Sequence, residues 1–228
     1  MAERAIAIDG PSGAGKSTTA RLLARELDFK YIDTGAMYRA VALAGLRNGL
    51  DFENEEELAG KLTALAEEIK INFSPPDQQG RVRVYLNGEN VTEDIRKLEV
   101  DQQVSRVASI AGVREVMLTK QRELAENEPV VMDGRDIGTR VLTDADLKIF
   151  LTASLKTRAR RRFKDHQAQG ESLSLQEVED RLRKRDARDR GRSHSPLRRA
   201  ADAVEISTDN REPEDVVRKI KDLFREVN

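Results

Sequence analysis

One stretch near the N-terminus, IAIDGPSGAGKSTTARLLA at residues 6–24, constrains the fold of this chain more than any other feature. Gly10, Gly15, Lys16 and Ser17 fit the pattern GxxxxGK[ST], which requires a strand before it and a helix after it. Glycines let backbone N–H groups approach an anion closely, and the N-terminus of the helix adds its dipole. We therefore expect a nucleoside triphosphate here, with the Lys16 ammonium on its outer phosphates and the Ser17 hydroxyl suited to Mg²⁺.

Short apolar runs alternate with helical patterns along the rest of the chain. The predicted buried strands are residues 5–8, 30–32, 129–132, 147–151 and 203–206. Apolar residues spaced three and four apart predict helices from about residue 16 and over residues 37–48, 113–126, 155–168, 174–189 and 213–226. This alternation favours an α/β fold in three layers, with a five-stranded parallel sheet between helices.

Residues 70–92 break this rhythm, because KINF and RVRVYLNGENVT alternate with period two. Turn signals lie at Pro75, Pro76 and Gly80 and again at Asn87-Gly88. We expect a small antiparallel unit inserted into the α/β core, with the helix-rich segment 53–68 as a candidate to join it.

Charge is distributed unevenly along the chain. The 228 residues carry 40 basic and 41 acidic side chains, for a net charge of −1. Residues 158–199 hold 12 Arg and 2 Lys against 7 acidic residues, a net charge of +7. A locally basic segment in a near-neutral protein suggests an anionic ligand.

Composition excludes several classes of protein. The chain has no Cys, so it has neither disulfides nor thiolate chemistry. No apolar run reaches the roughly 18 residues of a membrane span, and Met1 leads directly into a strand-like segment. We expect a soluble cytoplasmic protein without a membrane partner.

The stretch YIDTGAMYR at residues 31–39 follows the second predicted strand. Asp33 can hold a metal-bound water or orient a hydroxyl group, and Thr34 offers a hydroxyl. Arg39 follows about one helical turn later. The alternative is a helix N-cap, in which Asp33 or Thr34 accepts from free backbone N–H groups.

The stretch MDGRDIG at residues 132–138 follows another buried strand. Ligands of parallel sheets bind beyond the carboxyl ends of the strands, where Asp133, Arg135 and Asp136 would lie. A surface salt bridge would also explain an Arg-Asp pair, but the nearby phosphate loop favours a binding function.

The stretch KRDARDRGRSHSPLRRAADA at residues 184–203 is the third polar stretch. Arg185, Arg188 and Arg192 would share one helix face if the helix continued that far. A solvated face is the ordinary meaning of such a run. Together with the Arg residues at 158–162, the pattern favours a lid that closes over phosphates, which Arg binds in bidentate geometry.

These motifs together resemble the bacterial cytidylate kinases, members of the nucleoside monophosphate kinase group of P-loop kinases. The resemblance extends over essentially the whole chain. It includes GPSGAGKST at 10–18, DTGAMYR at 33–39, SRVASIAGVRE at 105–115, DGRDIGT at 133–139, RDARDRGR at 185–192 and SPLRRAADA at 195–203. It implies a kinase core over 1–59 and 106–228 with a lid at about 158–192, and an inserted acceptor-nucleotide domain over 60–105.

The resemblance also implies a role for each matching residue. ATP would contact the lid residues Arg158, Arg161 and Arg162 and the loop residues Gly10, Pro11, Ser12, Gly13, Ala14, Gly15, Lys16, Ser17 and Thr18. CMP would contact Thr34, Arg39, Ser105, Arg114, Arg135, Asp136, Arg185, Asp189 and Arg192. Catalysis would depend on Lys16, Arg135, Arg185, Asp189 and Arg192. Mg²⁺, carried by ATP, would meet Ser17, with Asp33 as a second candidate.

The implied reaction is phosphorylation of CMP and dCMP by ATP, in a monomer. A P-loop kinase for another monophosphate, such as UMP, is the first alternative. A nucleotide-gated nucleic-acid-binding module is the second, but its Arg residues are interleaved with acidic ones and aromatic residues make up only 4%. A GTPase is disfavoured because no guanine-reading N/TKxD stretch is found. We expect His166 to be solvated and His194 to be structural, without a catalytic role for either.

Overall fold

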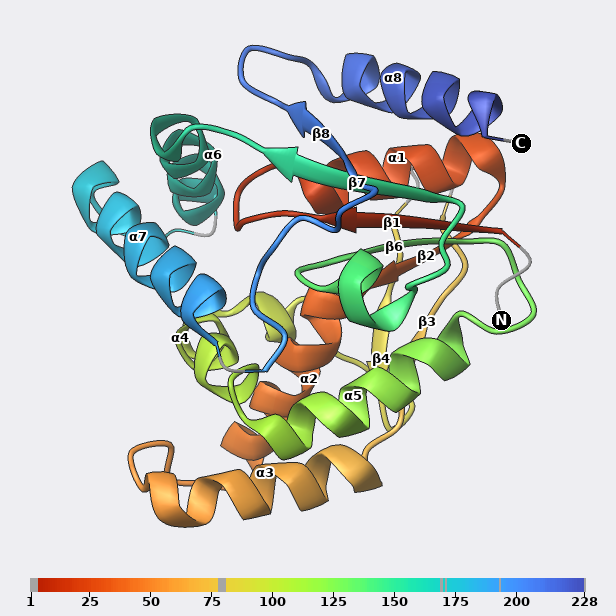
Figure 1. The fold of residues 1–228 in the computed structure, drawn as a ribbon. Helices are drawn as coiled ribbons and strands as arrows, with labels where there is room; N and C mark the ends of the chain where they lie inside the picture. Colours follow the sequence, from red (N-terminus) through yellow and green to blue (C-terminus); the bar gives the residue numbers. More distant parts are fainter. Residues whose placement is uncertain (1–3, 78–80, 169, 171, 193, 228) are drawn as a thin grey trace.

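A computed structural model describes residues 4–77, 81–168, 170, 172–192 and 194–227. Five strands form one parallel sheet in the order β2-β6-β1-β7-β8 (Figure 1). Their bounds are β1 Ala5–Asp9, β2 Lys30–Asp33, β6 Val130–Gly134, β7 Leu147–Thr152 and β8 Val204–Ser207. The predicted five-stranded parallel sheet is confirmed, and the strand ends differ from the prediction by one or two residues.

Helices cover both faces of this sheet (Figure 1). On one face lie α1 (Lys16–Leu27) and α8 (Pro213–Glu226), whose apolar side chains pack with those of β1 and β7. On the other face lie α2 (Thr34–Arg47) and α5 (Ala111–Leu124), with α3 (Glu55–Glu68) farther out. Burial on both faces explains why the central strands β1 and β6 are apolar without alternation.

The predicted antiparallel unit is also confirmed. Its strands β3 (Ile71–Phe73), β4 (Val84–Leu86) and β5 (Glu89–Asn90) form a separate antiparallel sheet. Asn87 and Gly88 both have positive φ, as a tight turn between two strands requires. The predicted limits of the inserted domain, residues 60 and 105, fall inside α3 and α4 (Leu98–Val107). The division of the chain into domains stays a prediction.

Two local structures did not follow from the sequence patterns. The first is α4, which follows the short 3₁₀ turn η1 (Asp94–Arg96). The second is η2 (Ile137–Val141), a π-helical turn directly after the DGRD motif. The carboxylate of Asp9 accepts from the backbone N–H groups of Ile137 and Gly138, both at 2.8 Å. This carboxylate therefore ties the start of η2 to the end of β1.

The basic segment forms two helices, α6 (Leu155–Ala168) and α7 (Leu175–Gly191). They lie together beyond the carboxyl ends of the strands, with a small apolar core that includes Ala159, Val178 and Leu182 (Figure 1). Ser174 and Glu177 form a capping box that begins α7. In the part of the chain that the structure describes, no helix is long and apolar enough to cross a membrane.

Candidate active site

A cleft of about 500 Å³ lies beyond the carboxyl ends of β1, β2 and β6. The phosphate loop, the start of α2, the turn after β6 and helices α4, α6 and α7 surround it. Most of the predicted site residues line this one cleft: Ser12, Gly13, Gly15, Lys16, Ser17, Thr18, Asp33, Thr34, Arg39, Ser105, Arg114, Arg135, Asp136, Arg162, Arg185, Asp189 and Arg192. Residues more than 170 positions apart in the chain therefore share a single cleft.

Some residues that line the cleft had no role predicted from the sequence, and some residues predicted to contact ATP do not line it. The lining side chains without a predicted role include Tyr38, Arg96, Val104, Ala108 and Asp165. The predicted residues that do not line it are Gly10, Pro11, Ala14, Arg158 and Arg161. Tyr38 lies within the motif DTGAMYR at 33–39, so its place in that motif was the available signal.

The phosphate loop adopts the strained backbone that its glycines predict. Gly10 and Gly15 have φ angles of +148° and +84°, and a Cβ on Gly10 would lie 2.0 Å from the carbonyl oxygen of Leu151. Helix α1 begins at Lys16, and no side chain caps its N-terminus. The first N–H groups of α1 therefore point into the loop, as in an anion-binding site.

Lys16 lies at the base of the loop and is only 6% exposed. Its ammonium donates to the carbonyl oxygen of Pro11 at 3.0 Å. Burial and the nearby charges of Arg135 and Arg185 lower the pKa of Lys16 to about 7, although Asp133 and Asp9 oppose this. A phosphate anion beside Lys16 would favour its charged form.

Ser17 and Asp133 form the oxygen-rich part of the cleft. The Ser17 hydroxyl donates to Asp133 Oδ2 at 3.1 Å, and the Tyr31 hydroxyl donates to Asp133 Oδ1 at 2.8 Å. Burial, together with the charge of Asp33, raises the pKa of Asp133 to about 7. Asp33 accepts from the N–H of Ala36 at 3.0 Å, which makes it the N-cap of α2.

These oxygens fit a hard divalent cation, although they do not complete a site. Hydroxyl and carboxylate oxygens are the ligands that Mg²⁺ prefers, usually with phosphate oxygens and water. Within the described ranges, no group of three or more His, Cys, Asp or Glu side chains could hold a metal ion. A cation beside Ser17 and Asp133 would therefore need ligands from a bound phosphate.

The far end of the cleft contains a buried ion pair. Arg114 Nη2 lies 2.5 Å from Asp136 Oδ2, and the two side chains are 5% and 9% exposed. The Arg114 guanidinium also lies over the Tyr38 ring at 5.5 Å and donates to the carbonyl oxygen of Ala108 at 3.1 Å. The Ser105 hydroxyl and Arg114 Nε are buried, and neither has a hydrogen-bond partner among the described residues. Such polar atoms beside a cleft are suited to bind a flat polar ligand.

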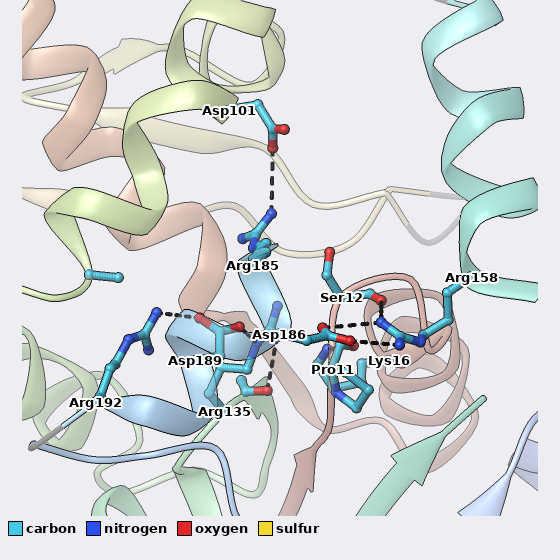
Figure 2. A network of polar contacts seen from close by, with 12 residues as sticks. Pro11, Ser12, Lys16, Asp101, Arg135, Arg158, Arg185, Asp186, Asp189 and Arg192 are labelled. Atoms are coloured by element: carbon cyan, nitrogen blue, oxygen red, sulfur yellow. Dashed lines mark hydrogen bonds and ion pairs between the residues drawn. The ribbon is translucent and has the colours of Figure 1, made fainter. Parts of the chain in front are cut away.

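Asp189 organises two arginines at the middle of the cleft (Figure 2). It is 1% exposed and accepts from Arg135 Nε at 2.8 Å and from Arg192 Nη2. Burial opposes ionisation of Asp189, but the charges of Arg135, Arg192 and Arg185 keep its pKa below the ordinary value. Asp189 therefore holds the two guanidinium groups on one side of the cleft.

The prediction that Arg185, Arg188 and Arg192 share one helix face depended on the helix reaching Arg192, and the helix ends before it. Helix α7 ends at Gly191, so Arg192 follows the helix and has extended backbone angles. Arg185 and Arg192 line the main cleft, whereas Arg188 lines a neighbouring cavity of about 290 Å³. Arg185 also lines this cavity, so it borders both spaces.

The three predicted lid arginines lie in three different environments. Arg158 is buried, pairs with Asp186 at 2.6 Å and donates to the carbonyl oxygen of Ser12 at 3.1 Å (Figure 2). Arg161 donates to Thr208 and borders a second cavity of about 570 Å³ beside the phosphate loop. Arg162 lines the main cleft. Only Arg161 and Arg162 thus border open space near the loop.

The two histidines lie outside this arrangement. The prediction that His166 is solvated is wrong. His166 is only 8% exposed, and it borders the 290 Å³ cavity. The amphipathic pattern of α6 was too weak to indicate this burial. His194 is exposed and does not line the cleft.

Comparison with known proteins agrees with this geometry. The family model described as cytidylate kinase matches residues 6–226. A cytidylate kinase of Leuconostoc mesenteroides is 46% identical over 219 residues, covering 96% of this chain and 95% of the relative. That of Caldanaerobacter subterraneus subsp. tengcongensis is 47% identical over 96% of this chain and 94% of the relative. That of Bacillus licheniformis is 48% identical over 94% of this chain and 93% of the relative.

Proposed function

The chain belongs to the cytidylate kinase family, and we propose that it transfers the terminal phosphoryl group of ATP to CMP and dCMP. It is a nucleoside monophosphate kinase, with the phosphate loop for the donor and the far end of the cleft for the acceptor base. The observation that carries the choice of base is the buried Arg114–Asp136 pair beside the Ser105 hydroxyl.

The chemistry of cytosine matches these side chains. Its N4 amino group is a donor, for which the Asp136 carboxylate is an acceptor. Its N3 and O2 atoms are acceptors, for which Arg114 and Ser105 carry donors. Uracil has an oxygen in place of the amino group and would face Asp136 with a second acceptor. A site of buried polar groups rejects a ligand that leaves those groups unpaired. We therefore expect the site to bind cytosine much more strongly than uracil.

Arginines at the middle of the cleft would hold the phosphate of the acceptor. Arg135 and Arg192, oriented by Asp189, lie between the base end and the phosphate loop. Arg39 lines the same cleft from α2. Guanidinium groups bind phosphate oxygens in bidentate geometry, so these three side chains would fix the nucleophilic oxygen.

In the reaction, an oxygen of the CMP phosphate attacks the γ-phosphorus of ATP. A new P–O bond forms as the bond from the γ-phosphorus to the β,γ-bridging oxygen breaks, and ADP leaves. The nucleophile is already an anion, so no general base is required. Positioning and charge supply most of the catalysis, here from Lys16, Arg135, Arg185 and Arg192. Closure of α6 and α7 would exclude water from the γ-phosphoryl group.

Ser17, Asp133 and Asp33 would hold Mg²⁺ together with the phosphates of ATP. The cation would neutralise the charge that develops on those phosphates. The hydrogen bond from Ser17 to Asp133 already brings two of these oxygen donors together. The nucleoside of ATP would extend toward Arg161 and the 570 Å³ cavity, while Arg158 supports the loop from behind.

We propose a functional monomer, as the family resemblance implies. The substrates are cytoplasmic metabolites, which supports a cytoplasmic location.

Steady-state assays with Mg·ATP test the proposal. CMP, dCMP, UMP, AMP, dTMP and GMP serve as acceptors, with a reaction lacking acceptor as control. Turnover of CMP and dCMP alone is the expected result. Turnover without acceptor, or none with any, would contradict the kinase function.

The variant Asp136→Asn tests how the base is chosen. We expect the preference for CMP over UMP, as a ratio of kcat/KM, to fall by about 100-fold, because the carboxylate no longer opposes O4 of uracil. Asp144→Asn, at an exposed carboxylate, is the matched control. An unchanged preference in Asp136→Asn would refute this assignment.

A further inference from the structure

Asp101 is an acidic residue among the arginines of the cleft, and the sequence motifs did not single it out. It lies on α4, and its Oδ1 atom accepts from Arg39 Nη2 of helix α2. The same oxygen lies 3.4 Å from Arg162 Nη2 of α6 and 3.7 Å from Arg185 Nη1 of α7. Figure 2 shows Arg185 reaching from α7 toward Asp101. A single carboxylate oxygen thus joins side chains from three other helices.

Asp101 meets these arginines from outside the nucleotide cleft. Arg39, Arg162 and Arg185 all line the main cleft, and Asp101 does not. It lines the adjacent 290 Å³ cavity, to which Arg162 and Arg185 also contribute. A nucleotide in the main cleft can therefore contact the arginines while Asp101 keeps its position behind them.

The charges of this group are incomplete without a ligand. Three guanidinium groups and the Asp101 carboxylate leave a net charge of +2, of which the more exposed Asp165, 3.6 Å from Arg162, offsets only part. A phosphate monoester carries close to −2 at neutral pH. Burial opposes ionisation of Asp101, but the charges of Arg39, Arg185 and Arg162 keep its pKa well below the usual range. The carboxylate thus stays ionised, and the positive charge that remains on the group attracts the phosphate of a nucleotide.

Without a shared anion, the three like charges would repel one another. Arg162 and Arg185 are long side chains from the two lid helices, and holding them still has an entropic cost. A partly buried carboxylate offsets both effects before the substrate arrives.

We propose that Asp101 is a positioning residue that holds Arg39, Arg162 and Arg185 ready for the phosphate of the acceptor nucleotide. It acts through the arginines and touches no reacting atom. The identity of the phosphate in this inference rests on the proposed kinase function. Through Asp101, Arg39 on the acceptor side of the cleft is connected to Arg162 and Arg185 of the lid.

The test compares Asp101→Asn with the wild type. Asparagine keeps the size and one acceptor oxygen but removes the charge. We expect KM for CMP to rise about ten-fold, with the Kd for ATP within two-fold of wild type. Asp101→Glu, which restores the charge, should recover part of the loss. Asp94→Asn is the matched control, because Asp94 also pairs with two cations, Arg47 and Lys97, but does not line the cleft.

Calorimetric titration separates positioning from a general structural role. Asp101→Asn should weaken binding of CMP about ten-fold and leave binding of cytidine, which lacks the phosphate, unchanged. Equal weakening for both ligands, or unchanged or tighter binding of CMP, would overturn the proposal. If the wild type phosphorylates another monophosphate instead of CMP, the function is wrong, and the same titration with that nucleotide and its nucleoside still decides the role of Asp101.

Discussion

Replacing Asp133 by Asn should stabilise the folded protein at neutral pH while it impairs catalysis. Asp133 is 3% exposed, and burial together with the charge of Asp33 raises its pKa from 3.8 to about 7. A raised pKa means that the folded protein binds this proton more tightly than the unfolded chain does. The contribution of Asp133 to the free energy of unfolding is therefore highest below about pH 4 and falls as the pH rises to about 7.

The size of the effect follows from the shift in the pKa of Asp133. About three units correspond to roughly 4 kcal/mol, of which about 2 kcal/mol is lost between pH 5 and pH 7. Asparagine avoids this loss, but its amide group satisfies the Ser17 and Tyr31 hydroxyls less well than a carboxylate does. Lys16 also loses a favourable charge. Allowing about 2 kcal/mol for these changes leaves the variant about 2 kcal/mol more stable at pH 8.

Urea unfolding at pH 5 and pH 8 measures this difference, with Asp144→Asn as the control at an exposed site. We expect nearly equal stabilities for Asp133→Asn and wild type at pH 5. At pH 8 the variant should be more stable and turn over Mg·ATP and CMP far more slowly. A variant that gains no stability from pH 5 to pH 8 relative to wild type would refute the reasoning.

Three further predictions concern the loop and the lid. Gly10→Ala places a Cβ against the Leu151 carbonyl and should lower stability by about 3 kcal/mol, measured by thermal unfolding; an unchanged Tm contradicts it. Arg158→Met leaves Asp186 buried without its ion-pair partner and should cost roughly 3–5 kcal/mol in urea unfolding, with most of it recovered by also changing Asp186 to Leu. Arg192→Ala should reduce kcat by about 10³-fold with the Kd for ATP unchanged, and an unaltered kcat would exclude its role.

The amino-acid sequence by itself determined the elements whose causes are local. The strand, loop and helix around GPSGAGKST depend on glycine torsion angles and on a short apolar run, so they could be read directly. The parallel sheet and the antiparallel insert followed from the period of the apolar residues. The family motifs also identified most of the residues that line the cleft.

The tertiary structure alone decided which charged groups meet. Asp101 and its arginine partners come from four helices, and Arg158 finds Asp186 across the two lid helices. Asp133 reaches Ser17 only because β6 lies beside β1. Unlike helices and strands, ion pairs of this kind produce no periodic pattern in the sequence. Their energy depends on distance and burial in three dimensions. The sequence specifies which charged side chains are present. The packing of the helices over the sheet determines which of them form pairs.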